Sequence, residues 1–127
     1  MSYAKKFLRD DKFALHAGIE LLEVQNGSAK VRMVVQPFHI NGVGLVHGGA
    51  LFTLADFAFA AAANSHDEVA VAINAFISYL KGIKAGTLYA EAEELSNSRR
   101  ISVYSIKITD DAGQLIAIFQ GMAYKRG

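Results

Sequence analysis

Residues 39–64 read HINGVGLVHGGALFTLADFAFAAAAN and fall into two parts of different character. Residues 39–49 are punctuated by glycine, which is typical of a loop that changes direction sharply. Residues 50–65 contain neither glycine nor proline and are rich in alanine and leucine, which are good helix formers. We predict a helix of about fifteen residues here, about 23 Å long.

The apolar residues of this predicted helix surround it instead of keeping to one stripe. A helix that is apolar on every side is buried. It is too short for a comfortable membrane span and carries Asp56 near its middle, so we predict a central helix inside a soluble protein. Asp56 is the only ionisable residue between His47 and His66, and a carboxylate in apolar surroundings needs a compensating feature. The alternative is that Asp56 faces solvent or caps a neighbouring backbone group.

The composition of the 127 residues favours one domain that spans residues 1–127. Hydrophobic residues make up 52%, which argues against disorder, and the net charge of +1 gives no broad electrostatic reason to expect nucleic acid or a membrane surface as partner. The absence of cysteine excludes disulfides and thiol nucleophiles and permits a cytoplasmic location. The four histidines lack the spacing of a metal site, and we expect neither metal nor cofactor. The N-terminal residues show no secretory signal.

The segments before the central stretch predict a helix and a hairpin. Residues 2–16 read as a short amphipathic helix, and the turn signal Asn26-Gly27 joins strands at residues 19–25 and 28–36. The predicted apolar side of the short helix consists of Phe7, Leu8, Phe13 and Leu15.

The segments after the central stretch predict strands. Residues 68–81 are apolar on both sides, so this strand lies either deep in the sheet or at a subunit contact. Further strands are expected at residues 87–95, 99–109 and 114–125. Strands gathered beside one helix indicate an α+β fold, with an antiparallel sheet curled around the helix. One layer of sheet leaves its outer face partly apolar, so we expect self-association about a two-fold axis.

These residues resemble the hotdog-fold acyl-CoA thioesterases, in particular the type associated with phenylacetate degradation. The likeness spans roughly residues 13–125, with Asn, Gly, His-Gly-Gly and Asp in register. It is carried by residues 41–49, 51–56, 77–81, 86–92 and 121–124. The resemblance implies a hotdog fold, a homodimer with two sites at its interface, often a homotetramer made of two such dimers, and hydrolysis of a coenzyme A thioester.

Carried over residue by residue, the resemblance assigns Asp56 as the catalytic carboxylate and the backbone N–H of Gly48 as the group that holds the thioester oxygen. Asn41 and His47 match the loop residues that line this site. In the family, the carboxylate comes from the subunit opposite the one whose helix start polarises the carbonyl.

Elementary chemistry agrees with these assignments. Attack on a thioester builds negative charge on the carbonyl oxygen, which the Gly48 N–H at a helix start would stabilise, and a side chain there would hinder the thioester. Asp56 could act as general base on a water or as nucleophile, and the Asn41 amide could hold the carboxylate or the water. His47 could act as a base, although no acidic partner is visible, or it could position the loop. Burial would favour its neutral form.

The remaining candidates concern the substrate. The phosphates of coenzyme A need cations, and ordinary surface charge is the alternative for each candidate cation. The candidate cations are Lys81, Arg99 and Arg100, and the other predicted substrate contacts are Gly49, Asn74 and Ser78. For Asn74 and Ser78, satisfying groups in the core is the alternative.

Two departures from the family pattern leave the acyl preference open. Gly82 stands where many relatives have proline, and Ala60 stands where some relatives carry Ser or Thr. Two other functions are considered. A non-catalytic acyl-CoA sensor usually needs a DNA-binding segment, for which we expect no room in the 38 residues before His39. A hydratase or dehydratase of the same fold would pair a histidine with an acidic residue.

Overall fold

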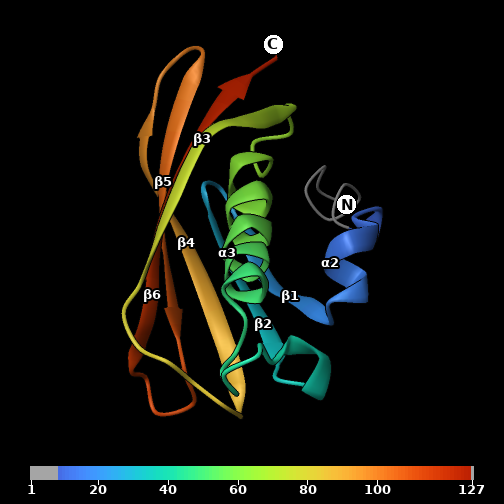
Figure 1. Ribbon diagram of the computed structural model, residues 1–127. Coiled ribbons are helices and arrows are strands. Elements are labelled where there is room, and N and C mark those ends of the chain that lie inside the picture. Colours follow the sequence, from blue (N-terminus) through green and yellow to red (C-terminus); the bar gives the residue numbers. More distant parts are fainter. Residues whose placement is uncertain (1–8, 127) are drawn as a thin grey trace.

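The chain forms an antiparallel sheet with one long helix packed on its face, as the computed structural model of residues 9–126 shows (Figure 1). Within this described part the strands lie in the order β1-β2-β4-β5-β6-β3. The predicted α+β class is confirmed. The elements are α2 (Lys12–His16), β1 (Ile19–Gln25), β2 (Ser28–Val34), the 3₁₀ turn η1 (Pro37–His39), α3 (Gly48–Ala63), β3 (Ala70–Tyr79), β4 (Thr87–Asn97), β5 (Ile101–Thr109) and β6 (Leu115–Lys125).

Helix α3 is the predicted central helix, and it contacts all six strands of the described sheet. Alanine dominates its inner side, so the helix axis can lie close to the sheet. Gly121 of β6 contributes to the same close approach, because a Cβ atom at this position would come within 2.8 Å of the Phe59 ring. Across residues 9–126 no helix is long and apolar enough to cross a lipid bilayer.

The inner face of the sheet supplies the other half of the core. Successive side chains of a strand point to opposite faces, so every second residue is buried against α3. Burying a large aliphatic or aromatic side chain contributes about 1.5–3 kcal/mol. The fully buried members include Val31, Met33, Leu88, Tyr104, Ile106, Ile108 and Phe119.

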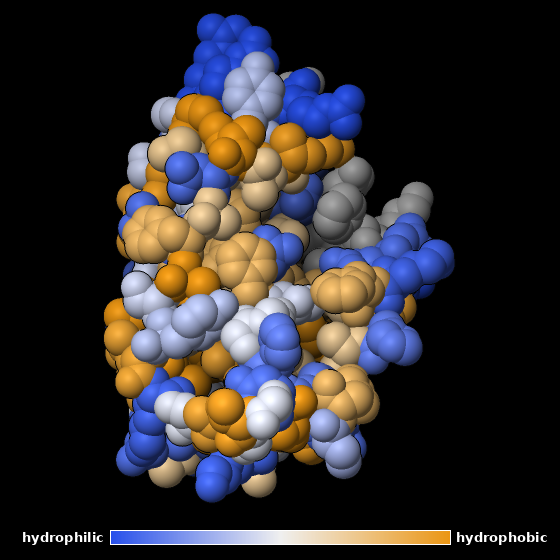
Figure 2. All heavy atoms as spheres, in the orientation of Figure 1, coloured by the Kyte–Doolittle hydropathy of each residue, from blue (hydrophilic) through white to orange (hydrophobic). Residues whose placement is uncertain are grey.

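Strand β3 lies at the edge of the sheet and, among the described strands, pairs only with β6. Its apolar side chains are bare: Ile73, Phe76 and Tyr79 are 54%, 53% and 53% exposed. In Figure 2, apolar side chains reach the surface along the side where β3 runs in Figure 1. Of the two predicted positions, deep in the sheet is wrong. An exposed apolar edge is the surface that a subunit contact would cover.

The N-terminal prediction is only partly met. Helix α2 is a short helix capped by Asp11, whose Oδ1 accepts from the Ala14 N–H at 3.0 Å. Ala14 is its buried residue, whereas Phe13 and Leu15, which belong to the predicted apolar side, are 71% and 55% exposed. A helix of this length has room for one inward residue. The predicted contributions of Phe7 and Leu8 lie outside the described residues.

Five strand boundaries shift by two residues from their predicted positions: β3 spans residues 70–79 instead of 68–81, β5 begins at residue 101 instead of 99, and the ends of β2 and β4 also move. Strand β2 ends at residue 34 instead of 36, because Pro37 begins η1 and cannot donate to a strand ladder. Strand β4 continues to residue 97 instead of 95, with a bulge between Glu94 and Ser96. The turn to β5 therefore begins at residue 98.

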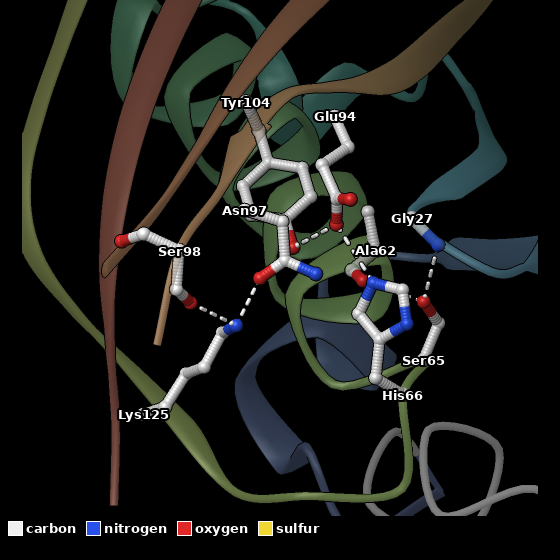
Figure 3. Close-up of polar contacts among 9 residues, drawn as sticks. All are labelled: Gly27, Ala62, Ser65, His66, Glu94, Asn97, Ser98, Tyr104 and Lys125. Atoms are coloured by element: carbon white, nitrogen blue, oxygen red, sulfur yellow. Dashed lines mark hydrogen bonds and ion pairs between the residues drawn. The ribbon is translucent and has the colours of Figure 1, made fainter. Parts of the chain in front are cut away.

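A polar cluster holds the far end of α3 (Figure 3). Ser65 Oγ accepts from the Gly27 N–H at 2.7 Å and donates to a carbonyl of the last helical turn at 2.7 Å. Glu94 accepts from the Tyr104 hydroxyl at 2.8 Å, and His66 Nε2 lies 2.7 Å from the same carboxylate oxygen. Burial opposes ionisation of Glu94, but the hydrogen bonds from His66 and Tyr104 outweigh it and lower its pKa. The cluster ties the helix end to the β1–β2 turn and to β4.

Candidate active site

The loop before α3 is closed by its own backbone and by Asn41. An isolated antiparallel bridge joins Ile40 to Val46. Asn41 Oδ1 accepts from the N–H groups of Val43 at 3.0 Å and Leu45 at 3.1 Å. The side-chain carbonyl of Asn41 therefore accepts hydrogen bonds from the loop backbone. Within the described part of the chain its NH₂ group has no acceptor, so only this half is available to hold a carboxylate or a water.

The start of α3 leaves a single backbone donor free. The first four N–H groups of a helix have no partner inside the helix. Three of them find acceptors: His47 N–H donates to the His39 carbonyl at 2.7 Å, Gly49 N–H to His47 Nδ1 at 2.8 Å, and Ala50 N–H to the His47 carbonyl at 2.9 Å. Among residues 9–126, no group accepts from the fourth, the N–H of Gly48. This free N–H is the group to which the family resemblance assigns the thioester oxygen.

His47 is the N-cap residue of α3 and is exposed, so the prediction that it is buried is wrong. Its Nδ1 accepts a hydrogen bond, which leaves the ring proton of the neutral form on Nε2. No carboxylate pairs with it in the described structure. These contacts support the positioning role rather than the role of a base.

The buried histidine of this region is His39, which is 3% exposed. Its Nδ1 accepts from the Gln36 N–H at 2.9 Å, and its Nε2 donates to the Ala17 carbonyl at 2.7 Å. It thus joins η1 to the end of α2. Sequence reasoning missed this role, because nothing in the local pattern distinguishes His39 from His47.

Two hollows flank the helix start. We name the first the loop hollow, of about 330 Å³, and the second the aromatic hollow, of about 630 Å³. Tyr79 lines both. The loop hollow is lined by Asn41, Leu45, Val46, Gly48, Leu51, Tyr79, Leu80, Lys81, Gly82 and Ile83. The aromatic hollow is lined by Phe13, His16, Ala17, Phe38, His39, His47, Gly49, Ala50, Phe52, Thr53 and Tyr79.

Tyr79 is the sheet residue that touches the helix start. Its hydroxyl donates to the Gly48 carbonyl at 3.0 Å, and a Cβ atom at position 48 would lie 3.1 Å from the phenol. Tyr79 therefore packs tightly against Gly48, which is a second reason for glycine at this position besides the approach of the thioester that the sequence suggested. A related packing reason holds at Gly82, where a Cβ atom would lie 3.0 Å from the Leu45 side chain.

Asp56 lies on the half-buried stripe of α3, with Thr53 one turn before it and Ala60 one turn after it. Burial, and to a smaller degree the negative charge of Asp11, raises the pKa of its carboxyl group. Within the described residues no group donates to this carboxylate and it caps no backbone group. Asp56 follows Gly48 by eight residues, which places it about 12 Å further along the helix axis. One chain therefore does not bring the two groups to a common reacting atom.

The relation to known proteins follows from residues 43–117, which match the family model described as the thioesterase superfamily. The chain belongs to the thioesterase superfamily. The matched residues include the helix start and Asp56. The predicted family resemblance and the predicted class of enzyme, a thioester hydrolase, are confirmed.

Three relatives of this thioesterase carry more detailed names. Acyl-coenzyme A thioesterase PaaI of Escherichia coli is 35% identical over 125 residues, 98% of this chain and 89% of that protein. The structure of E. coli PaaI matches with a TM-score of 0.94 at 36% identity, over 98% of this chain and 91% of that chain. The 1,4-dihydroxy-2-naphthoyl-CoA hydrolase of Listeria monocytogenes is 33% identical over 109 residues, 80% of this chain and 85% of the relative. A hypothetical thioesterase of Streptococcus pneumoniae, solved with coenzyme A, has a TM-score of 0.89 at 25% identity and covers 96% of each chain. The predicted hotdog fold is thereby confirmed.

The predicted cations of this thioesterase lie at two ends of the molecule. Lys81 lines the loop hollow, and its Nζ donates to Gln114 Oε1. Arg99 and Arg100 form the β4–β5 turn, which is attached to the end of β6 that pairs with the start of β3. The ten residues of β3 separate this turn from Tyr79 by about 30 Å. Within one chain, the two arginines do not join the site.

Asn74 and Ser78 lie on the outer face of β3. Ile77 pairs with the buried Phe119 and so points toward α3, whereas Ser78 pairs with the exposed Ile118 on the opposite face. Asn74 and Ser78 are both exposed, so the alternative that they satisfy groups in the core is wrong. The structure of one chain does not bring either residue to the helix start.

Proposed function

We propose that this member of the superfamily hydrolyses acyl-coenzyme A thioesters to a free acid and coenzyme A. The observation that carries the proposal is the free N–H of Gly48 at the start of α3, on the wall of the loop hollow. The helix dipole concentrates positive charge at this end, where a developing oxyanion gains most. The coenzyme A thioesters in the names of the E. coli and Listeria relatives support this substrate class.

The second part of the proposal is that two chains build each site. Because about 12 Å separates Gly48 from Asp56 along the helix of one chain, we place Asp56 of the partner subunit opposite the Gly48 N–H. The bare apolar edge of β3 is a suitable contact, because two such edges related by a two-fold axis pair antiparallel. The result is a homodimer with two sites at its interface.

A second surface supports the further association into a dimer of dimers. The outer face of the sheet carries exposed apolar side chains that pairing of the β3 edges would leave uncovered. They are Val71, Phe76, Ile118 and Tyr124. A homotetramer, one domain over residues 1–127 and a cytoplasmic location complete the proposal.

The chemistry then follows from the groups present. Asp56 removes a proton from a water, whose oxygen bonds to the thioester carbon while the Gly48 N–H donates to the carbonyl oxygen. Collapse breaks the C–S bond, and the proton passes from Asp56 to the leaving thiolate. A carboxylate of raised pKa is a stronger base than an ordinary one, which favours this route. Direct attack by Asp56 to give a mixed anhydride is the alternative route. The Asn41 NH₂ group would hold the water or the carboxylate.

The substrate would lie across the helix start. Lys81 at the loop hollow is suited to a coenzyme A phosphate, and antiparallel pairing of the β3 edges would bring Arg99 and Arg100 of the partner subunit toward the same hollow. The acyl group would occupy the aromatic hollow beside Gly49, whose own N–H is already bound by the His47 ring. Asn74 and Ser78 would contact substrate only across the dimer contact.

The proposal is tested by following thiol release from short-chain, long-chain and aromatic coenzyme A thioesters. We expect one class to be hydrolysed, and Asp56→Asn to lower turnover about 100-fold or more while binding survives. Glu23→Gln, the same chemical change at an exposed position of β1, is the control and should leave turnover unchanged. Native turnover by Asp56→Asn would remove Asp56 from the mechanism. Binding without release would favour the sensor, and hydration of an enoyl thioester would favour the hydratase.

A further inference from the structure

Resting on the proposed function, we infer that Tyr79 is a positioning residue for the oxyanion donor. The peptide unit between Gly48 and Gly49 is held at both ends. Its carbonyl accepts from the Tyr79 hydroxyl at 3.0 Å, and its N–H donates to His47 Nδ1 at 2.8 Å. These bonds come from opposite directions, one from the sheet edge and one from the helix cap.

The preceding peptide unit is restrained as well. The carbonyl of His47 accepts from the N–H groups of Ala50 at 2.9 Å and Leu51 at 3.1 Å. Gly48 therefore lies between two fixed peptide planes, and its own N–H has a single direction. Two consecutive glycines have the greatest backbone freedom of any residue pair, so this direction depends on the restraints around them.

Tyr79 provides the only one of these restraints that comes from outside the loop and helix, as far as the described residues show. It is the last residue of β3, and its phenol lies 3.1 Å from the position that a Cβ atom at Gly48 would take. The phenol thus fixes the helix start against the sheet at the junction of the two hollows. Removing only its hydroxyl leaves the ring contact and removes the hydrogen bond from the sheet to the Gly48 carbonyl.

The first experiment compares Tyr79→Phe with Tyr89→Phe on the thioester that the wild type hydrolyses best. Tyr89 lies on β4 with its ring 5.6 Å from Lys30 Nζ, away from the helix start, and serves as the matched control. A hydrogen bond of ordinary strength corresponds to about a fivefold change, so kcat of Tyr79→Phe should fall about fivefold. KM should stay within about twofold of the wild type, because the donor acts on the transition state. Equal kcat values for the two variants would overturn the inference.

The second experiment separates positioning from general damage by measuring binding without turnover. One probe is a coenzyme A ketone, in which CH₂ replaces the thioester sulfur and the carbonyl remains. The other is a thioether that lacks the carbonyl. Tyr79→Phe should weaken binding of the ketone about three- to tenfold and leave binding of the thioether unchanged, because only the ketone has a carbonyl that accepts from the Gly48 N–H. Equal loss for both probes would mean that Tyr79 acts as packing alone.

The wild type distinguishes the two levels of failure. If it releases no thiol from any thioester, the proposed function fails, whatever Tyr79→Phe does. If it hydrolyses thioesters and prefers the ketone to the thioether, while Tyr79→Phe behaves as Tyr89→Phe, the function stands and only the role of Tyr79 is refuted.

Discussion

The free N–H of Gly48 can be removed without removing the start of the helix. Gly48 is the first residue of α3, the one helical position where proline is well tolerated. The residue before it, His47, has φ −60° and ψ 136°, a conformation that proline allows in its neighbour. Gly48→Pro should therefore keep the helix and delete the single donor.

The structure also supplies the matched variant. A Cβ atom at position 48 lies 3.1 Å from the Tyr79 phenol, so alanine and proline both require this ring to shift by a few tenths of an ångström. Gly48→Ala keeps the N–H and places a Cβ atom at the same distance from the Tyr79 phenol. The difference between the two variants isolates the hydrogen bond from the packing.

Loss of one oxyanion donor lowers turnover about 10²- to 10³-fold, and we expect kcat of Gly48→Pro to lie below that of Gly48→Ala by this factor. The assay is thiol release under saturating thioester, with circular dichroism to verify that both variants fold. If Gly48→Pro turns over as fast as Gly48→Ala, the Gly48 N–H does not stabilise the transition state and the mechanism proposed above is refuted.

Three further predictions follow from the same geometry. Mixed dimers of Asp56→Asn and Gly48→Pro, formed by refolding equal amounts together, should regain about one quarter of wild-type turnover, because half the dimers carry one intact site. Since burial and the charge of Asp11 raise the pKa of Asp56, turnover should fall as the pH drops through a value above the ordinary 3.8, and Asp11→Asn should move this limb to lower pH. Gly121→Ala should lower the free energy of unfolding by about 1–3 kcal/mol in denaturant titrations, because the new Cβ atom lies 2.8 Å from the Phe59 ring.

Each of these has an outcome that contradicts it. Mixed dimers as inactive as either variant alone would place both groups in one chain's site. Asparagine still caps a helix, so Asp11→Asn should change the charge without losing α2. If the acidic side of the pH–turnover profile does not move in this variant, the charge of Asp11 does not raise the pKa of Asp56. Gly42→Ala, where 4 Å around the new atom is empty, is the control for Gly121→Ala, and equal stability of the two would refute the close packing.

Much of the fold could be predicted because its signals are local. The run without glycine or proline predicted α3, and the turn signal Asn26-Gly27 predicted the hairpin of β1 and β2. The position of β3 in the sheet could not be predicted. A central strand carries apolar residues on both faces, and so does an edge strand that packs against a second chain. The apolar pattern predicts that a strand is shielded from water, but it does not tell whether the same chain or a second chain shields it.

Parts of the candidate site that depend on one residue's own backbone could be predicted from the sequence. Parts that depend on contact with a residue far away in the chain could not. Gly48 follows from its place in the motif and at a helix start. The contact of Tyr79 with Gly48 spans 31 positions of the chain and depends on how the sheet edge turns back to the helix. The same limit explains why the sequence did not show that His39 is buried and His47 exposed. Both residues flank the same loop, and the folded conformation of that loop decides which ring points inward.

The proposed pairing at the exposed edge of β3 also has a consequence for how much protein a cell must make. When each catalytic centre needs two copies, a lone chain is idle however well it is folded. At low abundance the rate then rises with the square of the number of chains, and it becomes proportional to that number only once most of them are paired. Dilution alone would therefore switch this thioesterase off, without any change in its covalent structure or in its substrate.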